Sequence, residues 1–187
     1  MTFIVTRNDG NTFDPAKPIG VMFPSLQPEE EIRDIKHVNS VWVAVTSKGR
    51  ALRSEENIAT SNFTASTHPQ LSSTEKLTYN GGVWAFFGYD TSGVQTTLMS
   101  FDNAKTFFVS ATSSPQQPPL MTSLFFAANG VWYIVKKPNP TSNVFEVFTN
   151  FSTDPRDGTW NPQSLPVGFY PKDFSYSNGR ITLVGTN

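Results

Sequence analysis

Four aspartates offer the acidic groups that hydrolytic chemistry would need: Asp9, Asp102, Asp154 and Asp157. Two carboxylates at a fixed separation in a cleft can cleave a glycosidic bond, one of them acting as acid and the other as nucleophile or base. Each of these aspartates, however, lies in a short polar stretch, where a carboxylate accepts main-chain N–H groups and closes a turn. We therefore expect them to stabilise turns and name no catalytic residue.

Metal and thiol chemistry has few candidate residues. The two histidines, His37 and His68, are isolated and lack a partner at the spacing of a metal site, so neither a zinc site nor a histidine-based catalytic site is predicted. The chain has no cysteine, which excludes disulfides, Cys-ligated metals and a thiol nucleophile. No metal and no cofactor are predicted.

Aromatic residues that do not recur at a regular spacing are the best candidates for ligand binding. Tyr89 is followed by Asp90, and Tyr170 lies three residues before Asp173, each pair at a predicted loop or strand end. An aromatic ring can stack on a sugar while a neighbouring carboxylate binds the hydroxyl groups. We expect these four residues to form the ligand-binding site.

A repeat of β-hairpins must position these groups. Four segments share a tight turn followed by a strand that opens on a large apolar residue, namely Trp42, Trp84, Trp132 and Ile181, at spacings of 42 to 49 residues. Asn-Gly and Gly-Gly at these turns favour type I′ geometry, which needs positive φ at both central residues. A further strand precedes each turn, at 32–38, 76–79, 123–128 and 173–176. The three tryptophans are predicted to pack in the core.

A period of this length with four strands per unit is typical of a β-propeller blade. The 187 residues accommodate four repeats. The sequence therefore predicts an all-β chain forming a single domain over residues 1–187, a small propeller of four blades with four antiparallel strands each. The predicted blades are 30–66, 75–112, 121–165, and a closing blade that combines 172–187 with 1–18. Sharing the closing blade between the N- and C-terminal strands would pair otherwise open sheet edges.

A second pattern recurs in the later half of each repeat. Residues 6–13 and 100–107 align directly, 152–160 aligns with one insertion, and 54–63 is a degenerate copy. The pattern resembles the Asp box, Ser-x-Asp-x-Gly-x-Thr-Trp, of the bacterial-neuraminidase-like (BNR) repeat in sialidase-type propellers. The matching residues are Thr6, Asn8, Gly10, Thr12 and Phe13; Ser100, Asp102, Thr106 and Phe107; and Ser152, Asp154, Gly158, Thr159 and Trp160.

The resemblance implies an architectural role for the box, as the hairpin between the third and fourth strands of a blade. The carboxylate or amide accepts turn N–H groups, the glycine supplies positive φ, and the terminal aromatic residue packs between blades. Ala104 replaces that glycine, and the boxes at 54–63 and 152–160 carry insertions. We expect these turns to be less regular.

The same resemblance bears on function. Sialidases use an arginine triad and six repeats, whereas this chain has six arginines in total, no Phe-Arg-Ile-Pro motif and four repeats. Small cysteine-free Asp-box propellers resemble bacteriophage tail and baseplate proteins. This implies a non-enzymatic, tail-associated virion component that is structural or binds a receptor on the host surface, with virion proteins or host cell-surface glycans as partners. A lectin-like carbohydrate-binding module is the alternative, and a sialidase-type glycoside hydrolase comes third.

Charge and hydropathy limit the partners and the cellular locations that we expect for this chain. The formal net charge is −1 and only 16% of residues are charged, which argues against nucleic acid as a partner. No apolar run reaches the length of a membrane-spanning helix, and residues 1–10 lack the features of a signal peptide. The expected location is the virion, with a soluble cytoplasmic protein as the alternative. A homo-oligomer is compatible with a virion component, because virion assemblies repeat subunits about symmetry axes.

Overall fold

The computed structural model describes residues 2–3, 17–18, 23, 26–55, 63–93, 95–109, 122–137, 141–155 and 158–187. All regular elements in these residues are β-strands, which confirms the all-β prediction. The box at 6–13, including Thr6, Asn8, Gly10, Thr12 and Phe13, lies outside the described residues, as does most of the degenerate copy at 54–63.

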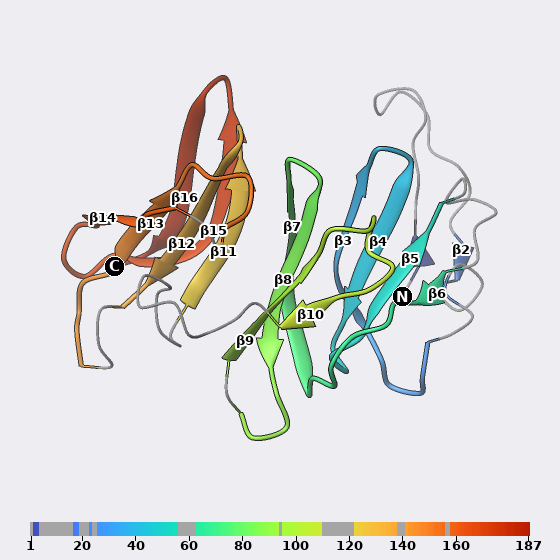
Figure 1. Cartoon of the computed structure of the whole chain (residues 1–187). Helices are drawn as coiled ribbons and strands as arrows, with labels where there is room; N and C mark the ends of the chain where they lie inside the picture. The colour runs from blue at the N-terminus through green and yellow to red at the C-terminus, as the bar shows by residue number, and fades with distance from the viewer. Residues whose placement is uncertain are drawn as a thin grey trace.

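Three four-stranded antiparallel sheets follow one another along the chain (Figure 1). The first contains β3 (Ile32–Val38), β4 (Val41–Thr46), β5 (Ala51–Ser54) and β6 (Thr64–Ala65). The second contains β7 (Ser73–Asn80), β8 (Val83–Tyr89), β9 (Gln95–Ser100) and β10 (Phe108–Val109). The third contains β11 (Thr122–Ala128), β12 (Val131–Lys136), β13 (Glu146–Asn150) and β14 (Asn161–Ser164). Within each of these sheets every strand pairs with the next one in sequence, so the predicted four-stranded antiparallel sheets are confirmed.

The tight turns between the first two strands of each unit have the predicted backbone. Both central residues have positive φ in all four turns: Asn39 and Ser40, Gly81 and Gly82, Asn129 and Gly130, Asn178 and Gly179. Such turns match the right-handed twist of the strands they join. Each hairpin is therefore specified locally by its own turn residues.

Successive sheets pack face to face through buried apolar clusters. One cluster joins the first and second sheets and includes Val45 and Trp84, a second joins the second and third sheets and includes Phe87 and Trp132, and a third joins the third sheet to the hairpin that follows it. Trp84 and Trp132 are buried, as predicted. Trp42 is only half-buried and stacks on His37, with ring centroids 4.4 Å apart.

The terminal strands differ from the prediction. β15 (Tyr170–Ser177) pairs with β16 (Arg180–Thr186) in a two-stranded sheet, and β1 (Thr2–Phe3) pairs with β2 (Lys17–Pro18) in another. The two hairpins predicted to share a closing blade thus form separate sheets, and they lie at opposite ends of the row of sheets in Figure 1. The physical reason is that hairpins form from local turns, whereas joining the two termini depends on the curvature of the whole array.

Candidate ligand-binding site

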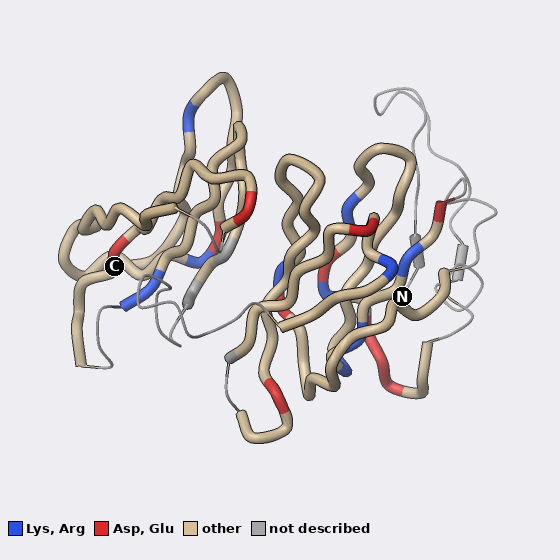
Figure 2. The backbone as a smooth tube through the Cα atoms, viewed as in Figure 1, with Lys and Arg blue, Asp and Glu red and all other residues tan. Residues whose placement is uncertain are grey.

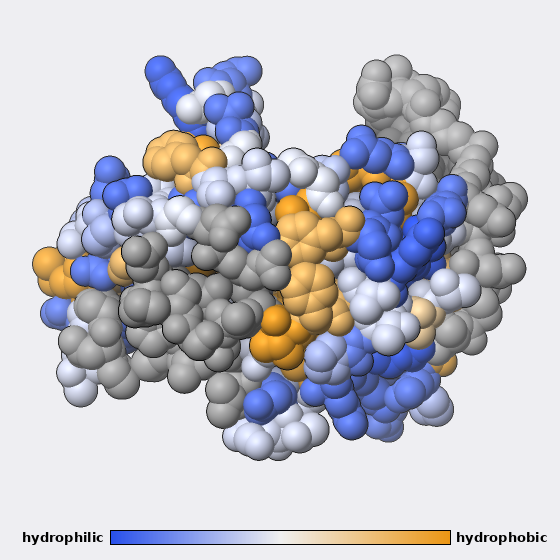
Figure 3. All heavy atoms as spheres, in the orientation of Figure 1, coloured by the Kyte–Doolittle hydropathy of each residue, from blue (hydrophilic) through white to orange (hydrophobic). Residues whose placement is uncertain are grey.

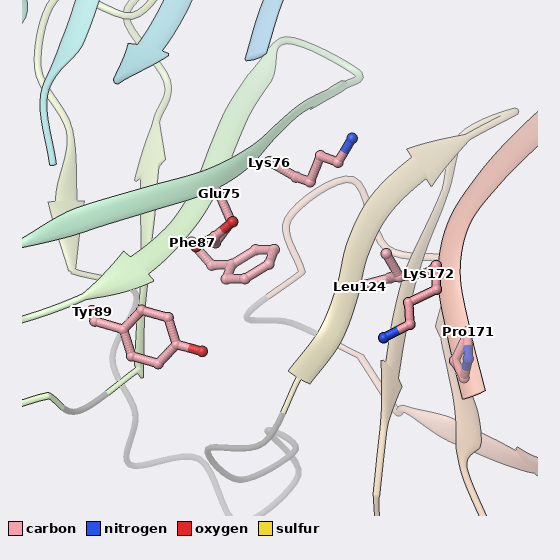
Figure 4. A pocket seen from close by; sticks show the side chains of 7 residues that line it. All are labelled: Glu75, Lys76, Phe87, Tyr89, Leu124, Pro171 and Lys172. Carbon is pink, nitrogen blue, oxygen red and sulfur yellow. The ribbon is translucent and has the colours of Figure 1, made fainter. Parts of the chain in front are cut away.

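A cavity of about 320 Å³ opens where three successive units of the fold come together (Figure 4). The second sheet contributes residues from β7 and β8, the third sheet contributes one from β11, and the last hairpin contributes two from β15. The lining residues are Glu75, Lys76, Phe87, Tyr89, Leu124, Pro171 and Lys172.

The first strand of each unit contains a β-bulge, and in β7, β11 and β15 residues at or beside the bulge line the cavity. The strand pairing shifts between Thr74 and Leu77 in β7, between Thr122 and Leu124 in β11, and between Pro171 and Asp173 in β15. The same shift occurs in β3, between Ile32 and Asp34. Because a bulge inserts one unpaired residue and redirects its side chain, it turns Glu75 and Lys172 out of the regular alternation of their strands.

Two glycines make room for these bulges. Gly88 pairs with Thr74, and a Cβ atom on it would lie 2.1 Å from the carbonyl oxygen of Ser73. Gly185 holds the equivalent position opposite Pro171, where a Cβ atom would lie 2.2 Å from the carbonyl oxygen of Tyr170. Both contacts are with main chain, so only glycine fits without moving the bulged strand.

The cavity holds charges of both signs beside apolar rings. Figure 4 shows the Lys172 side chain reaching from β15 toward the wall that carries Glu75, and the Tyr89 hydroxyl pointing into the space between them. Lys76 extends from β7 to form an ion pair with Asp173 of β15, with 3.8 Å between Nζ and Oδ1. Phe87 and Leu124 are buried and supply apolar surface. This lining can contact a ligand that has both charged and apolar groups.

The first predicted pair of ligand-binding residues is divided by the structure. Tyr89, at the end of β8, lines the cavity and is 38% exposed. Asp90 belongs to the following turn, where its carboxylate accepts a hydrogen bond from the Ser92 amide at 2.8 Å. In this arrangement Asp90 stabilises the turn while Tyr89 faces the site.

The second pair lies at the opposite wall. Asp173 is next to the cavity residue Lys172 and holds Lys76 by their ion pair. Tyr170 packs edge-on against Phe145, with ring centroids 5.8 Å apart, and is not among the lining residues. The structure therefore places Tyr89 and Lys172, the neighbour of Asp173, in the lining of one cavity and leaves Tyr170 outside that lining.

Most of the cavity-lining residues were missed by the sequence analysis. Bulges have no simple sequence signature, and Glu75, Lys76 and Lys172 read as ordinary charged residues on a strand. Aligning the first strands of the repeats would have indicated them, because adjacent charged residues recur at the bulge as Arg33-Asp34, Glu75-Lys76 and Lys172-Asp173.

The box at 100–107 forms a closed hydrogen-bonded turn. The Ser100 hydroxyl donates to Asp102 Oδ1 at 2.7 Å, and this oxygen also accepts the amides of Lys105 and Thr106 at 3.1 and 2.9 Å. Burial opposes ionisation of Asp102, but the hydrogen bonds from Thr106, Ser100 and Lys105 outweigh it and lower the pKa of the carboxyl group. Phe107 is buried between the first and second sheets.

Ala104 departs from the expectation of an irregular turn. It adopts the left-handed backbone itself, with φ of 61°, and its amide donates to the Ser100 hydroxyl at 3.1 Å. The hydrogen bonds to Asp102 and Ser100 hold this alanine where a glycine would be unstrained, so the box keeps its shape.

The box at 152–160 uses a different acceptor. The Ser152 amide donates to the side chain of Asn150 at 2.8 Å, and the Trp132 indole donates to the Thr153 carbonyl at 3.2 Å. Gly158 has φ of 79°, Asp154 is partly buried, and Thr159 is exposed. Trp160 packs in the cluster between the second and third sheets, which is the position expected for the terminal aromatic residue.

Other kinds of site find little support in the part of the chain that the structure describes. No three His, Asp or Glu side chains come together there as metal ligands, and no helix there could span a membrane. Figure 2 shows basic and acidic residues interspersed along the described backbone. In the view of Figure 3 apolar side chains gather over the middle sheet. Phe108 of β10 stacks there on Phe101, the residue that follows β9, and the two are 37% and 42% exposed.

Comparison with solved structures shows the fold. The structure titled "YCF48 bound to D1 peptide" superposes with a TM-score of 0.57 at 12% sequence identity, over 98% of this chain and 54% of that one. The chain has a β-propeller fold. The crystal structure of BamB from Moraxella catarrhalis, also a propeller, gives a TM-score of 0.48 at 13% identity, over 81% of this chain and 40% of that one. This propeller chain thus spans about half the length of the propellers it resembles. No protein-family model and no curated protein sequence matches it.

Proposed function

We propose that this chain is a non-enzymatic propeller that binds a segment of a partner protein in the cavity at its strand bulges. The observation that carries the proposal is the lining itself, in which Glu75 and Lys172 offer opposite charges beside the rings of Tyr89 and Phe87. A polypeptide segment presents charged and apolar side chains together with main-chain hydrogen-bonding groups, so it matches each part of this lining.

Two further considerations support a protein partner. The YCF48 propeller, which matches over 98% of this chain, was solved bound to a D1 peptide. Short cysteine-free Asp-box propellers resemble bacteriophage tail and baseplate proteins, and on that resemblance another virion protein is the expected partner. We also propose that the chain has four blades and serves as a structural or receptor-binding part of a bacteriophage virion.

Absence of catalysis is part of the proposal. Glycoside hydrolysis needs two carboxylates placed around the scissile bond. Among the seven residues that line the cavity, Glu75 is the one carboxylate. The expected result with chromogenic glycosides, including a sialoside, is no turnover above buffer. Turnover that is abolished in Glu75→Gln would overturn the non-enzymatic reading.

A lectin-like function is the second candidate, because the cavity lining contains both the exposed ring of Tyr89 and the carboxylate of Glu75. A sugar ring could stack on the tyrosine while Glu75 accepts hydrogen bonds from hydroxyl groups. A pyranose, however, has no charged groups to engage Lys172 together with Glu75, unless it is an acidic or amino sugar. The charges therefore favour the peptide.

The deciding experiment is selection of random displayed peptides on the full chain, followed by binding of one selected peptide to variants. Tyr89→Ser and Lys172→Glu should each weaken binding by about tenfold or more, which corresponds to roughly 1.4 kcal/mol. Tyr176→Ser is the matched control, since Tyr176 is also 38% exposed but lies outside the cavity lining.

The outcomes separate the candidates. Peptides that bind Tyr89→Ser as well as the unmodified chain would place the binding surface elsewhere and overturn the proposal. Failure to select any peptide, together with binding on a glycan array that is lost in Tyr89→Ser, would replace it with the lectin function.

A further inference from the structure

Two adjacent charged residues lie at the bulge in each of two strands that contribute to the cavity. In β7 they are Glu75 and Lys76, and in β15 they are Lys172 and Asp173. The order of the charges along the chain is reversed between the two strands, so each carboxylate of one strand has an ammonium group of the other as its counterpart. The two pairs of opposite charge are Glu75 with Lys172, and Lys76 with Asp173.

One of these pairs is closed and the other is open. Lys76 Nζ and Asp173 Oδ1 are 3.8 Å apart and form an ion pair. Glu75 and Lys172 line the cavity instead, and neither forms an ion pair in the part of the chain that the structure describes. Figure 4 shows Lys172 reaching from β15 toward the wall that carries Glu75. The cavity of about 320 Å³ therefore has an uncompensated charge of each sign in its lining.

The open pair leaves an electrostatic interaction that a ligand can complete. Coulomb attraction falls with distance, and water and salt in the space between two charges weaken it further. A cation beside Glu75 and an anion beside Lys172 would each have a counter-ion in direct contact. A ligand with two like charges meets one of these side chains with repulsion, so the cavity selects for a ligand that carries one charge of each sign.

The remainder of the lining suits an apolar group with hydrogen-bonding main chain beside it. Phe87, Leu124 and Pro171 are buried and supply apolar surface. A charge placed against this surface has no partner and is costly to bury, which disfavours a ligand that is charged along its whole length. The Tyr89 hydroxyl can both donate and accept a hydrogen bond, as the amide and carbonyl groups of a polypeptide require.

The two walls determine the spacing of the charges in such a polypeptide. Successive side chains of an extended segment point to opposite sides. A segment that lies between β7 and β15 directs one side chain toward Glu75 and the next toward Lys172. Side chains at an odd separation therefore face opposite walls, whereas those at an even separation face the same wall.

We propose that the partner segment is an extended stretch that carries one basic and one acidic side chain at an odd separation, the basic one on Glu75 and the acidic one on Lys172. This inference rests on the proposed function and adds to it the charge pattern of the bound segment. On binding, Glu75 and Lys172 each gain the oppositely charged contact that Lys76 and Asp173 already provide for each other.

Exchange of the two charges provides the first test. The double variant Glu75→Lys, Lys172→Glu keeps the net charge of −1 and inverts the order of the charges. Peptides selected on the unmodified chain should bind this variant about tenfold or more weakly, and the same peptides with their acid and base exchanged should bind it better than they bind the unmodified chain.

The matched control exchanges an ion pair outside the cavity. Arg33 and Glu31 lie 3.6 Å apart, are exposed, and do not line the cavity. The double variant Glu31→Arg, Arg33→Glu should therefore leave the affinity for both forms of the peptide unchanged. Thermal melts of the two double variants check that each remains folded.

Synthetic forms of one selected peptide test the spacing. Moving its acidic residue by one position, which makes the separation from the basic residue even, should weaken binding to the unmodified chain by about threefold or more. Moving the acidic residue by two positions keeps the separation odd and should weaken binding less. Equal binding of the odd and even forms would overturn the extended arrangement.

The outcomes distinguish failure of this inference from failure of the proposed function. Peptides that lose binding in Tyr89→Ser but are insensitive to the exchange of Glu75 and Lys172 would overturn the charge pattern and leave the peptide site intact. Peptides that bind Tyr89→Ser as well as the unmodified chain, or a selection that yields no peptide, would overturn the proposed function and this inference with it.

Discussion

Asp34 of β3 accepts a hydrogen bond from the main-chain amide of Leu77 in β7, with 3.0 Å between Oδ2 and N. The bond lies directly after the bulge in both strands and ties the first sheet to the second. The other carboxylate oxygen of Asp34, Oδ1, accepts a hydrogen bond from the Ile35 amide at 2.9 Å. A bulge leaves main-chain groups without a partner on the adjacent strand, and a carboxylate from the neighbouring sheet satisfies one of them.

Asp34→Ala should therefore lower the free energy of unfolding by about 1–3 kcal/mol, because two amides lose their acceptor in a partly buried place. Urea denaturation measures this. Asp173→Ala is the matched comparison, since Asp173 also accepts the next amide but forms only an exposed ion pair across the sheets, and it should cost below about 1 kcal/mol. Equal losses for both variants would contradict the role of the Leu77 bond.

The Asp box at 100–107 predicts a pH dependence. The hydrogen bonds to Asp102 lower its pKa in the folded chain below the value in the unfolded chain, so its stabilising contribution is fully present above about pH 4 and is lost as the pH falls through the folded pKa. Asp102→Asn keeps an acceptor without this titration. The stability difference between the unmodified chain and Asp102→Asn, measured by urea denaturation, should therefore shrink as the pH falls from about 5 toward 2.

The control for this effect is Asp90→Asn. Asp90 also accepts a turn amide, that of Ser92, whereas Asp102 accepts two turn amides, those of Lys105 and Thr106, and the Ser100 hydroxyl. A difference curve for Asp102→Asn that stays flat over this pH range would show that the carboxylate does not hold the box.

Trp84 provides a test of the repeat register. It is 1% exposed, packs between the first two sheets and lies edge-on to Tyr79 at 4.9 Å. Trp84→Ala should cost about 3–5 kcal/mol of unfolding free energy, because the large cavity left behind cannot collapse fully. Val167→Ala, at a residue that is 72% exposed, should stay within about 0.5 kcal/mol. A loss below about 1 kcal/mol for Trp84→Ala would mean that this face is not a core.

Local sequence signals predicted the parts of the fold that local chemistry controls. The turn pairs such as Gly81-Gly82 and Asn129-Gly130 specify hairpins because their backbone accepts positive φ. The regular spacing of Trp84 and Trp132 predicted buried residues that pack between sheets. Their burial depends on neighbouring repeats that carry the same pattern, so it could be inferred from the sequence.

Features that depend on distant strands could not be read in this way. The bulges at Glu75 and Lys172 are irregularities in the pairing of each first strand with its neighbour, and both residues line the cavity. Trp42 is half-buried and stacks on His37, although its local sequence is like that of the buried Trp84. Tyr170 and Tyr89 are both tyrosines at strand ends, yet Tyr170 packs on Phe145 beside the cavity.

A series of similar β-hairpins with aromatic residues between them could be inferred from the sequence, because turn chemistry and the alternation of side chains act over a few residues. Tertiary packing determines which charged residues meet in one cavity and that the terminal hairpins form separate two-stranded sheets. Both depend on how many small inter-sheet rotations add up along the array, a sum that no single repeat contains.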